Sequence, residues 1–267
     1  MVGAAGHVRR RARSFRLPGL MSLLQALAVL AAGFTAGGIN AVVGSGSLVT
    51  FPVLLAVGYA PVTANVSNSI GLVFGNVSAV LGYRRELVGQ RERIAFGGAG
   101  TALGALTGGI LLLTLPEGVF EAVVPVLILF ACALMVARPK PKLSHGSLSH
   151  HRKFALLGIG FAVGVYGGYF GAAQGVILLA ALRFLIPDKL QRLNGLKNVM
   201  VGIANGVAAL LFMVVAHVAW DAAALIAVGS IAGAQLGARY GRRIPEETLR
   251  WTVVTVGVAV AIVLLVK

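Results

Sequence analysis

Long apolar stretches separated by short polar or basic loops make up most of the chain. Six stretches are long enough to be single spanning helices, at residues 62–83, 94–115, 119–137, 194–215, 222–238 and 250–266. A helix that crosses a bilayer needs about 20 mostly apolar residues. The pattern therefore predicts an all-α polytopic membrane protein.

Two further apolar regions, 22–58 and 154–186, are too long for one span and are interrupted near their middle by glycine. The interruptions are Gly44-Ser45-Gly46 in the first region and Gly167-Gly168-Tyr169-Phe170-Gly171 in the second. We expect each region to form two limbs of roughly 13–20 residues at about 1.5 Å per residue. Each pair of limbs would dip into the membrane and return as a helical hairpin, with Gly44, Gly46 and Gly171 as helix breakers.

The composition agrees with a membrane protein and excludes several other classes. Hydrophobic residues are 58% of the chain, charged residues are 12%, and the mean hydropathy is +0.90. A soluble domain has about 45–50% apolar and about 25% charged residues. These values exclude disorder, a coiled coil and a disulfide scaffold. The one cysteine, Cys132, excludes an intramolecular disulfide and a cysteine metal cage.

The net charge of +15 comes mainly from short basic runs between apolar stretches, at 9–16, 84–93, 138–153, 183–192 and 239–243. Cytoplasmic loops of membrane proteins carry such an excess of Lys and Arg. The distribution favours loops near anionic lipid over a nucleic-acid interface. It predicts a multi-pass protein of the cell membrane.

The two halves of the chain resemble each other. Residues 129 positions apart match, as in Asn65 and Asn194, Asn76 and Asn205, and Pro116 and Pro245. The hairpin regions align at an offset of 127, as in Gly33 and Gly160, Gly37 and Gly164, and Gly44 and Gly171. We interpret 22–137 and 154–267 as two copies of one unit, joined by a basic, proline-broken cytoplasmic linker at 138–153.

The loop charges indicate that the two copies have opposite orientations. The basic loop 84–93 corresponds to the stretch 217–221, which has no Lys or Arg. The uncharged connections 58–61 and 114–118 correspond to the basic runs 187–192 and 239–243. Matching loops on opposite sides of the membrane are typical of inverted-topology repeats, which many transporters contain. Each repeat would be one helical hairpin plus three transmembrane helices.

This topology places the N-terminus outside, yet residues 9–16 contain five arginines. Three explanations stay open. Within the basic extension 1–21, residues 1–20 are not native and Met21 is the true start; or the first hairpin does not fold back; or the segment resembles a signal peptide.

Polar residues inside the membrane are costly, and they mark functional sites. Asn65, Asn68 and Asn76 form one stripe in the first half, and a matching stripe in the second half contains Asn194, Lys197, Asn198 and Asn205. The hairpins add Asn40, Ser45, Ser47, Thr50, Tyr166, Tyr169 and Gln174. We expect the stripes and both hairpin tips to converge on one site at the midplane.

Lys197 is the sharpest candidate because its apolar helix carries no other charge, and its counterpart is Asn68. A buried cation indicates an anionic substrate, although the lysine could also extend to the cytoplasmic surface. The free N–H groups at the start of a broken helix would bind the same anion. The recurring Gly-x-x-x-Gly pairs outside the tips are interpreted as helix packing sites. No nucleotide-binding motif and no acid–base pair at depth is found, so an enzyme is not expected.

One motif runs from Gly33-Phe34 through Gly37-Gly38-Ile39-Asn40 and Gly44-Ser45-Gly46-Ser47 to Phe51-Pro52 and Asn65-x-x-Asn68. Its partner is Gly164-x-Tyr166-Gly167-Gly168-Tyr169-Phe170-Gly171, followed by Asn194-x-x-Lys197-Asn198. Together they resemble the TauE/SafE family, the sulfite exporter family, over about residues 22–266. The resemblance implies movement of sulfite, sulfoacetate, other sulfur-containing anions or organic acids across the cytoplasmic membrane of a prokaryote.

The sequence thus predicts a secondary transporter that exports a small anion, sulfite or an organosulfonate first, by alternating access. A passive anion channel and a transporter of another organic acid are the alternatives. No metal, cofactor or nucleic acid is expected, the lipid bilayer is a partner, and protons as coupling ion and a homo-oligomer stay open. The expected substrate-binding residues are Asn40, Gly44, Ser45, Gly46, Ser47, Asn65, Asn68, Tyr169, Gly171, Gln174, Asn194, Lys197 and Asn198.

Overall fold

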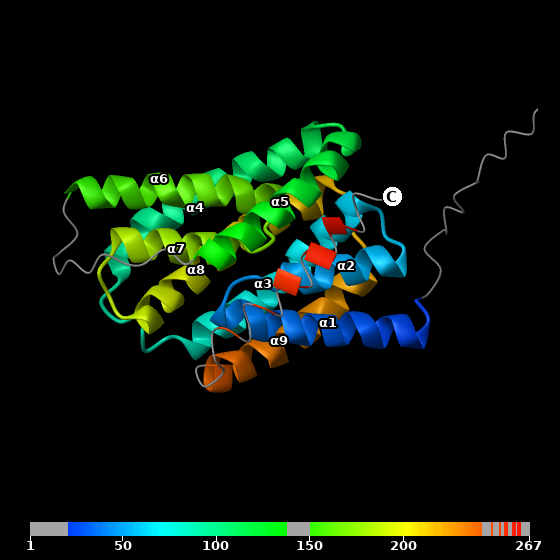
Figure 1. Ribbon diagram of the computed structural model, residues 1–267, viewed down its shortest axis with the longest axis horizontal. Helices are drawn as coiled ribbons and strands as arrows, with labels where there is room; N and C mark the ends of the chain where they lie inside the picture. The colour runs from blue at the N-terminus through cyan, green and yellow to red at the C-terminus, as the bar shows by residue number, and fades with distance from the viewer. Residues whose placement is uncertain are drawn as a thin grey trace, which may run out of the picture.

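A computed structural model describes residues 21–137, 150–241 and scattered positions from 247 to 262. These residues form helices and contain no strand (Figure 1). The helices are α1 Leu23–Val42, α2 Ser47–Val57, α3 Pro61–Gly82, α4 Arg91–Thr114, α5 Glu117–Ala137, α6 His150–Tyr169, α7 Gln174–Leu185, α8 Leu190–Val215 and α9 Trp220–Tyr240. The basic N-terminal segment and linker positions 138–149 lie outside the described residues, and α6 already begins at His150, within the predicted linker.

Five of the described helices, α1, α3, α4, α8 and α9, are long and apolar enough to cross a membrane. The predicted span 62–83 is α3, and 94–115 is α4, which begins three residues earlier at Arg91. Position 251 and several positions from 254 to 262 are helical within the predicted span 250–266. The predicted class, an all-α polytopic membrane protein, is confirmed.

Both glycine-interrupted regions reverse direction where the sequence predicts. Gly44 follows α1 with φ 91°, and Gly171 follows α6 with φ 74°, a backbone region open mainly to glycine. The limbs are unequal, because α1 and α6 have 20 residues each whereas α2 has 11 and α7 has 12. The first limb of each hairpin is therefore about 30 Å long, and the return limb covers about half that length.

Gly46 lies in the interruption between α1 and α2, but its backbone differs from that of Gly44. It has an ordinary right-handed φ of −60° and directly precedes α2 as its N-cap. A Cβ there would collide with the backbone of Ala36 in α1. Gly46 is therefore small because the returning chain lies against the middle of α1, and the turn itself depends on Gly44.

Glycines bring the long helices into close contact, as the Gly-x-x-x-Gly pattern predicts. α1 runs parallel to α9, where Gly33 faces Ile226 and Gly37 faces Ser230. α4 runs parallel to α6, where Gly100 faces Leu157. The pair Gly202 and Gly206 is an exception: Gly202 faces only the Asn76 side chain, and nothing lies near Gly206.

The two glycine-mediated interfaces match at the offsets of the sequence repeat. A Cβ on Gly233 of α9 would meet the carbonyl oxygen of Phe34, and one on Gly104 of α4 would meet that of Phe161. The glycines differ by 129 positions and the phenylalanines by 127. The next glycines along each helix, Gly237 and Gly108, repeat the correspondence with the carbonyls of Gly38 and Val165.

The basic runs within the described residues, at 84–93, 150–153, 183–192 and 239–241, gather at one end of the bundle. Gln90, before α4, donates to the carbonyl of Arg192 in the first turn of α8, and Lys153 of α6 pairs with Glu92 of α4 at 3.1 Å. We call this the basic end, formed by residues 83–93, 150–153, 186–192 and 239–241. The opposite, neutral end is formed by residues 58–61, 114–118 and 216–221, which contain no Lys or Arg.

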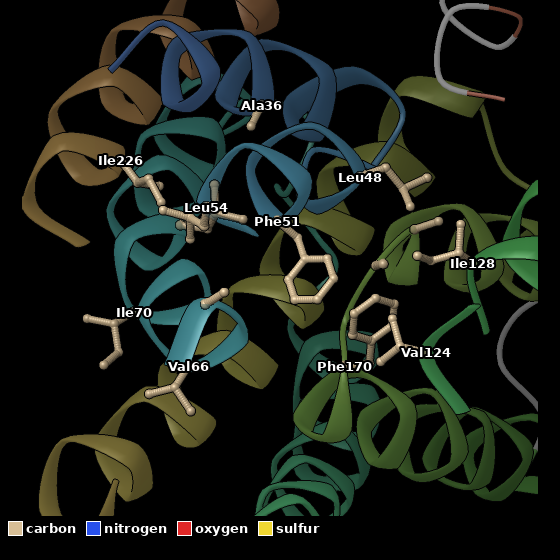
Figure 2. Close-up of a cluster of buried hydrophobic side chains, with 14 of the residues drawn as sticks. Ala36, Leu48, Phe51, Leu54, Val66, Ile70, Val124, Ile128, Phe170 and Ile226 are labelled. Carbon is tan, nitrogen blue, oxygen red and sulfur yellow. The ribbon is translucent and has the colours of Figure 1, made fainter. Parts of the chain in front are cut away.

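Apolar side chains fill the space between the hairpins and the long helices, as Figure 2 shows for one cluster. Phe51 of α2 packs edge-on against Phe170, with ring centroids 5.3 Å apart. Phe120 of α5 contacts both rings and also Tyr169. These aromatic rings cover the second hairpin tip and join it to the return limb of the first hairpin.

Candidate functional site

The two hairpin tips touch each other inside the bundle. The backbone N–H of Gly175, in the first turn of α7, donates to the carbonyl oxygen of Gly44 at 3.0 Å. A Cβ on Gly44 would lie 2.5 Å from the Cα of Gly175. Only glycine on both sides allows this approach, so the sequence that breaks the helices also lets their tips meet.

Asn40 organises the first tip because both of its polar groups are engaged. Its side-chain Oδ1 accepts the N–H of Gly46 at 2.8 Å, at the start of α2. Its main-chain oxygen accepts a hydrogen bond from the Lys197 ammonium at 3.0 Å. Asn40 thereby connects the buried cation to the N-terminus of the return limb.

Lys197 is fully buried, with 0% of its surface exposed. The alternative in which it extends to the cytoplasmic surface is therefore wrong. Its ammonium instead lies at the C-terminal end of α1, where the helix dipole places partial negative charge on unpaired carbonyls. An ammonium has three N–H donors, and the bond to Asn40 uses one of them.

Two asparagines of α8 hold the neighbouring carbonyl. Asn198 donates to the oxygen of Ala41 at 3.1 Å, and Asn194 donates to the same oxygen at 3.4 Å. Asn194 also donates to the Tyr83 hydroxyl at 3.1 Å. The polar stripe of α8 thus binds the end of α1.

At the second tip, a single residue from the opposite half makes the corresponding bond. Asn65 of α3 donates to the carbonyl oxygen of Tyr169 at 3.0 Å, at the end of α6. Two contacts within the hairpin support the turn. Gln174 donates to the oxygen of Val163 at 3.3 Å, and the Tyr166 hydroxyl donates to that of Ala172.

Asn68, the counterpart of Lys197, has a different partner. It accepts a hydrogen bond from the hydroxyl of Thr50, so it joins α3 to the return limb of its own hairpin. The sequence marked Thr50 as a buried polar residue, but it gave no reason to pair it with Asn68.

Several buried polar atoms of the site have no hydrogen-bond partner among the described residues. They are Ser45 Oγ, Asn65 Oδ1, Gln174 Oε1 and Asn194 Oδ1. Such atoms are rare in folded proteins, and each calls for an explanation. A serine hydroxyl can donate to an anion, and a carboxamide NH₂ has two N–H donors, of which Asn65 and Gln174 each use one in the bonds above.

The remaining predicted residues take supporting places. Ser47 starts α2 and is buried, and Gly171 makes the turn after α6. Asn76 lies further along α3, beside Gly202 of α8, about two turns from Asn68. Among the described side chains, no group of three or more His, Cys, Asp or Glu residues could hold a metal ion.

The described part of the bundle centre contains one cation and no carboxylate. Acidic side chains of the described residues lie at its ends, such as Asp188 just before α8 and Asp221 at the start of α9. Two broken helices that meet around a buried polar centre are the construction of many secondary transporters. The fold and the site together define the class as a membrane transporter.

The family model for the sulfite exporter TauE/SafE matches residues 29–264. The chain belongs to this family. Residues 29–264 include both hairpins, both polar stripes and the whole of the buried centre.

Curated bacterial relatives are named as transporters. The chain is 28% identical over 257 residues to the probable membrane transporter protein YfcA of Escherichia coli K12, covering 93% of this chain and 90% of that one. It is 29% identical over 211 residues to a probable membrane transporter protein of Haemophilus influenzae, covering 78% and 81%. A probable membrane transporter protein, ORF9, of Sinorhizobium sp is 29% identical over 239 residues, covering 88% and 90%. No solved structure matches the chain.

Proposed function

We propose that this protein exports a small anion, with sulfite or an organosulfonate as the first candidates. The observation that carries the proposal is the fully buried Lys197 ammonium at a centre where the described residues place no carboxylate. A buried cation without a protein counterion favours a negatively charged ligand. The sulfur oxyanions come from the family, whose description names sulfite export.

The anion site we propose lies between the two hairpin tips. Lys197 supplies charge, Ser45 supplies its unpartnered hydroxyl, and Gln174 and Asn65 supply the second N–H of amides whose first N–H binds Val163 and Tyr169. Neither α2 nor α7 has a side-chain cap at its N-terminus, and the dipoles of both helices add partial positive charge there. The first N–H groups of α7 are bonded to backbone carbonyls, such as that of Gly44. Asn194 and Asn198 act through the end of α1, which they hold in place.

We also propose that the two halves form an inverted repeat that works by alternating access. The matching glycine contacts of α9 with α1 and of α4 with α6 support this relation. The gathering of the basic runs at one end supports a cytoplasmic position for that end in the cell membrane. The domains of the proposal are 22–137 and 154–267, which rock around the tips. Protons as coupling ion and a homo-oligomer are kept as open parts of the proposal.

Flux into proteoliposomes tests this function. Sulfite, two organosulfonates and two carboxylates are compared with and without a proton gradient, for the wild type and for Lys197→Ala. We expect saturable flux of a sulfur oxyanion that falls at least about tenfold in Lys197→Ala, because one lost charge-assisted hydrogen bond has that order of effect.

A matched control is Lys189→Ala, which removes an exposed lysine just before α8 and should leave flux unchanged. Flux that rises linearly with concentration would indicate a channel instead. Preference for a carboxylate would keep the transporter but change the substrate. No flux of any panel anion would contradict the proposed function.

A further inference from the structure

A partly buried ionic cluster joins the two halves at the basic end. Asp188, between α7 and α8, accepts from Arg93 of α4 and from Arg192 of α8, the latter at 3.1 Å. Its other oxygen accepts the N–H of Lys189 at 2.7 Å. Although burial opposes ionisation, the bonds from Arg93, Lys189 and Arg192 hold the pKa of Asp188 below its usual range. The carboxylate is therefore charged and bound at neutral pH.

Neighbouring bonds make this contact part of a larger connection between the halves. The Arg192 guanidinium donates to the carbonyl of Val88 at 3.1 Å. The fully buried Gln90 donates to the carbonyl of Arg192 at 2.9 Å and accepts from Arg93 at 3.0 Å. Residues 188–192 of the second half are thereby fixed to residues 88–93 of the first half.

A smaller connection closes the neutral end. The Tyr59 hydroxyl, between α2 and α3, contacts both carboxylate oxygens of Asp221 at 3.0 and 2.9 Å. The N–H of Ala219 donates to the hydroxyl of Ser67 at 2.9 Å. Burial and the bond to Asp221 raise the pKa of Tyr59, so the phenol keeps its proton.

The two connections occupy matching places in the repeat. Tyr59 and Asp188 are 129 positions apart, and Asp221 is 129 positions from Glu92, the neighbour of Arg93. In both cases, the residue after the return limb of a hairpin is bonded to the start of a long helix in the other half. The chemistry differs: one contact is an ion pair and the other is a phenol on a carboxylate.

We propose that these contacts are two latches that open in turn during transport. The inner latch is Asp188 with Arg93 and Arg192, and the outer latch is Tyr59 with Asp221. Each ties the exit of one hairpin to the first turn of a long helix from the other half, so moving that hairpin away from the helix requires that its latch break. The inference rests on the alternating-access mechanism proposed above. In this structure both latches are closed.

The chemistry of the two latches predicts that one of them opens more easily than the other. The inner latch pairs groups that are both ionised and has three protein contacts between the halves, whereas in the outer latch only the carboxylate is ionised and one further bond joins the halves. Two opposite charges add Coulomb attraction to the hydrogen bond. The outer latch should therefore open more easily, and weakening the inner latch should change the balance more.

Accessibility of the tip to a thiol reagent tests the latches without a known substrate. Cys132, the one cysteine, is replaced in Cys132→Ala, and Ser45→Cys places a reporter at the first tip. A membrane-impermeant thiosulfonate is added to right-side-out or inside-out vesicles. Asp188→Asn and Tyr59→Phe are compared with this background, and Arg93→Gln opens the inner latch independently if Asp188→Asn does not fold.

We expect Asp188→Asn to speed modification from the basic end about tenfold, and Tyr59→Phe to speed it from the neutral end about threefold, as losses of an ion pair and of one phenol–carboxylate hydrogen bond would do. Asp188→Glu should restore most of the background rate. The matched control is Arg91→Gln, which removes an exposed charge from the first turn of α4, two residues before Arg93.

Equal acceleration from both sides, or none in Asp188→Asn and Arg93→Gln, would overturn the latches. These outcomes are separate from the flux result, since a protein that carries a different anion would still show side-selective access. A reporter that reacts rapidly from both sides in the background itself would contradict alternating access and the latches together.

Discussion

At the first hairpin tip, α8 supplies three donors to the end of α1, from Lys197, Asn198 and Asn194. At the second tip, α3 supplies one donor to the end of α6, from Asn65. The counterparts of Lys197 and Asn198 are Asn68 and Ser69, and their described bonds stay within their own half. A repeated architecture therefore carries an unrepeated set of bonds.

The first tip is therefore held by more hydrogen bonds to the opposite half than the second tip is. The first tip also contains the buried charge. We expect the first hairpin to act as the fixed side of the site and the second hairpin, α6 and α7, to move against it.

Substitution of the tip glycines should give the largest losses of stability. The sizes of these losses compare how closely the backbone is packed at the two tips. Gly44→Ala combines a left-handed φ with a backbone contact at 2.5 Å, so we expect a loss of about 3 kcal/mol or more in stability. Gly171→Ala meets the Gly167 oxygen at 3.0 Å and should lose about 1–3 kcal/mol.

Gly58→Ala is the matched control, since its φ is 110° but nothing lies within 4 Å of the added carbon. Strain alone should lower its stability by about 1 kcal/mol. Thermal unfolding in detergent measures all three variants. A Gly58→Ala variant as unstable as Gly44→Ala would show that the contact between the tips is not what matters.

Substitution of the asparagines that hold the tips should give the next largest losses of stability, and the loss should differ between the two tips. Asn65→Ala leaves the Tyr169 carbonyl without its described donor, at a cost of about 1–3 kcal/mol. Asn194→Ala should cost less, because Asn198 still donates to Ala41. Thermal unfolding of both single variants checks the order. Equal losses of stability would contradict the expectation that the first tip has a second donor and the second tip has none among the described bonds.

Hydrogen exchange should show the same difference in motion. Backbone amides near the second tip, residues 167–173, are expected to exchange faster than those near the first tip, residues 40–46, because weakly held segments open more often. Mass spectrometry of the purified protein measures both segments in one experiment. Faster exchange at the first tip would reverse the assignment of the fixed hairpin.

The smallest expected effects are changes of stability with pH. The contact at the basic end should weaken at low pH, and the contact at the neutral end should weaken at high pH. The lowered pKa of Asp188 adds stability that is present above the ordinary Asp value of about 4 and is lost as pH falls through the lowered pKa. The raised pKa of Tyr59 adds stability that is present below about pH 10 and is lost as pH rises through the raised value. Unfolding temperatures of Asp188→Asn and Tyr59→Phe across pH should lose the acid and the alkaline slope respectively.

The helices and the tips could be predicted from the sequence because hydrophobic runs and glycine interruptions determine them locally. α3 begins one residue before its predicted start, at a proline in the first helical position, and both hairpins turn where glycine occurs. The sequence predicts a helix break at Gly46 because glycine breaks helices. It does not show that glycine is needed there because the distant Ala36 lies so close.

The partners of the site residues could not be predicted in the same way. The stripe identified Asn65, Asn194 and Lys197, but they bond to backbone carbonyls that any residue would provide. Asp188 pairs with Arg93 across 95 positions, and only their places in the repeat relate this contact to Tyr59 and Asp221. Sequence periodicity places residues on a face, whereas the partner depends on how two distant halves meet.

Direct binding of an anion to the purified protein is the measurement closest to the central claim that the two tips form one site charged by Lys197. Radiolabelled sulfite is titrated onto the wild type, Lys197→Met and the exposed control Lys189→Met in detergent. We predict saturable binding of one anion per chain in the wild type and in Lys189→Met, and loss of this binding in Lys197→Met. Unchanged binding in a folded Lys197→Met protein would contradict it.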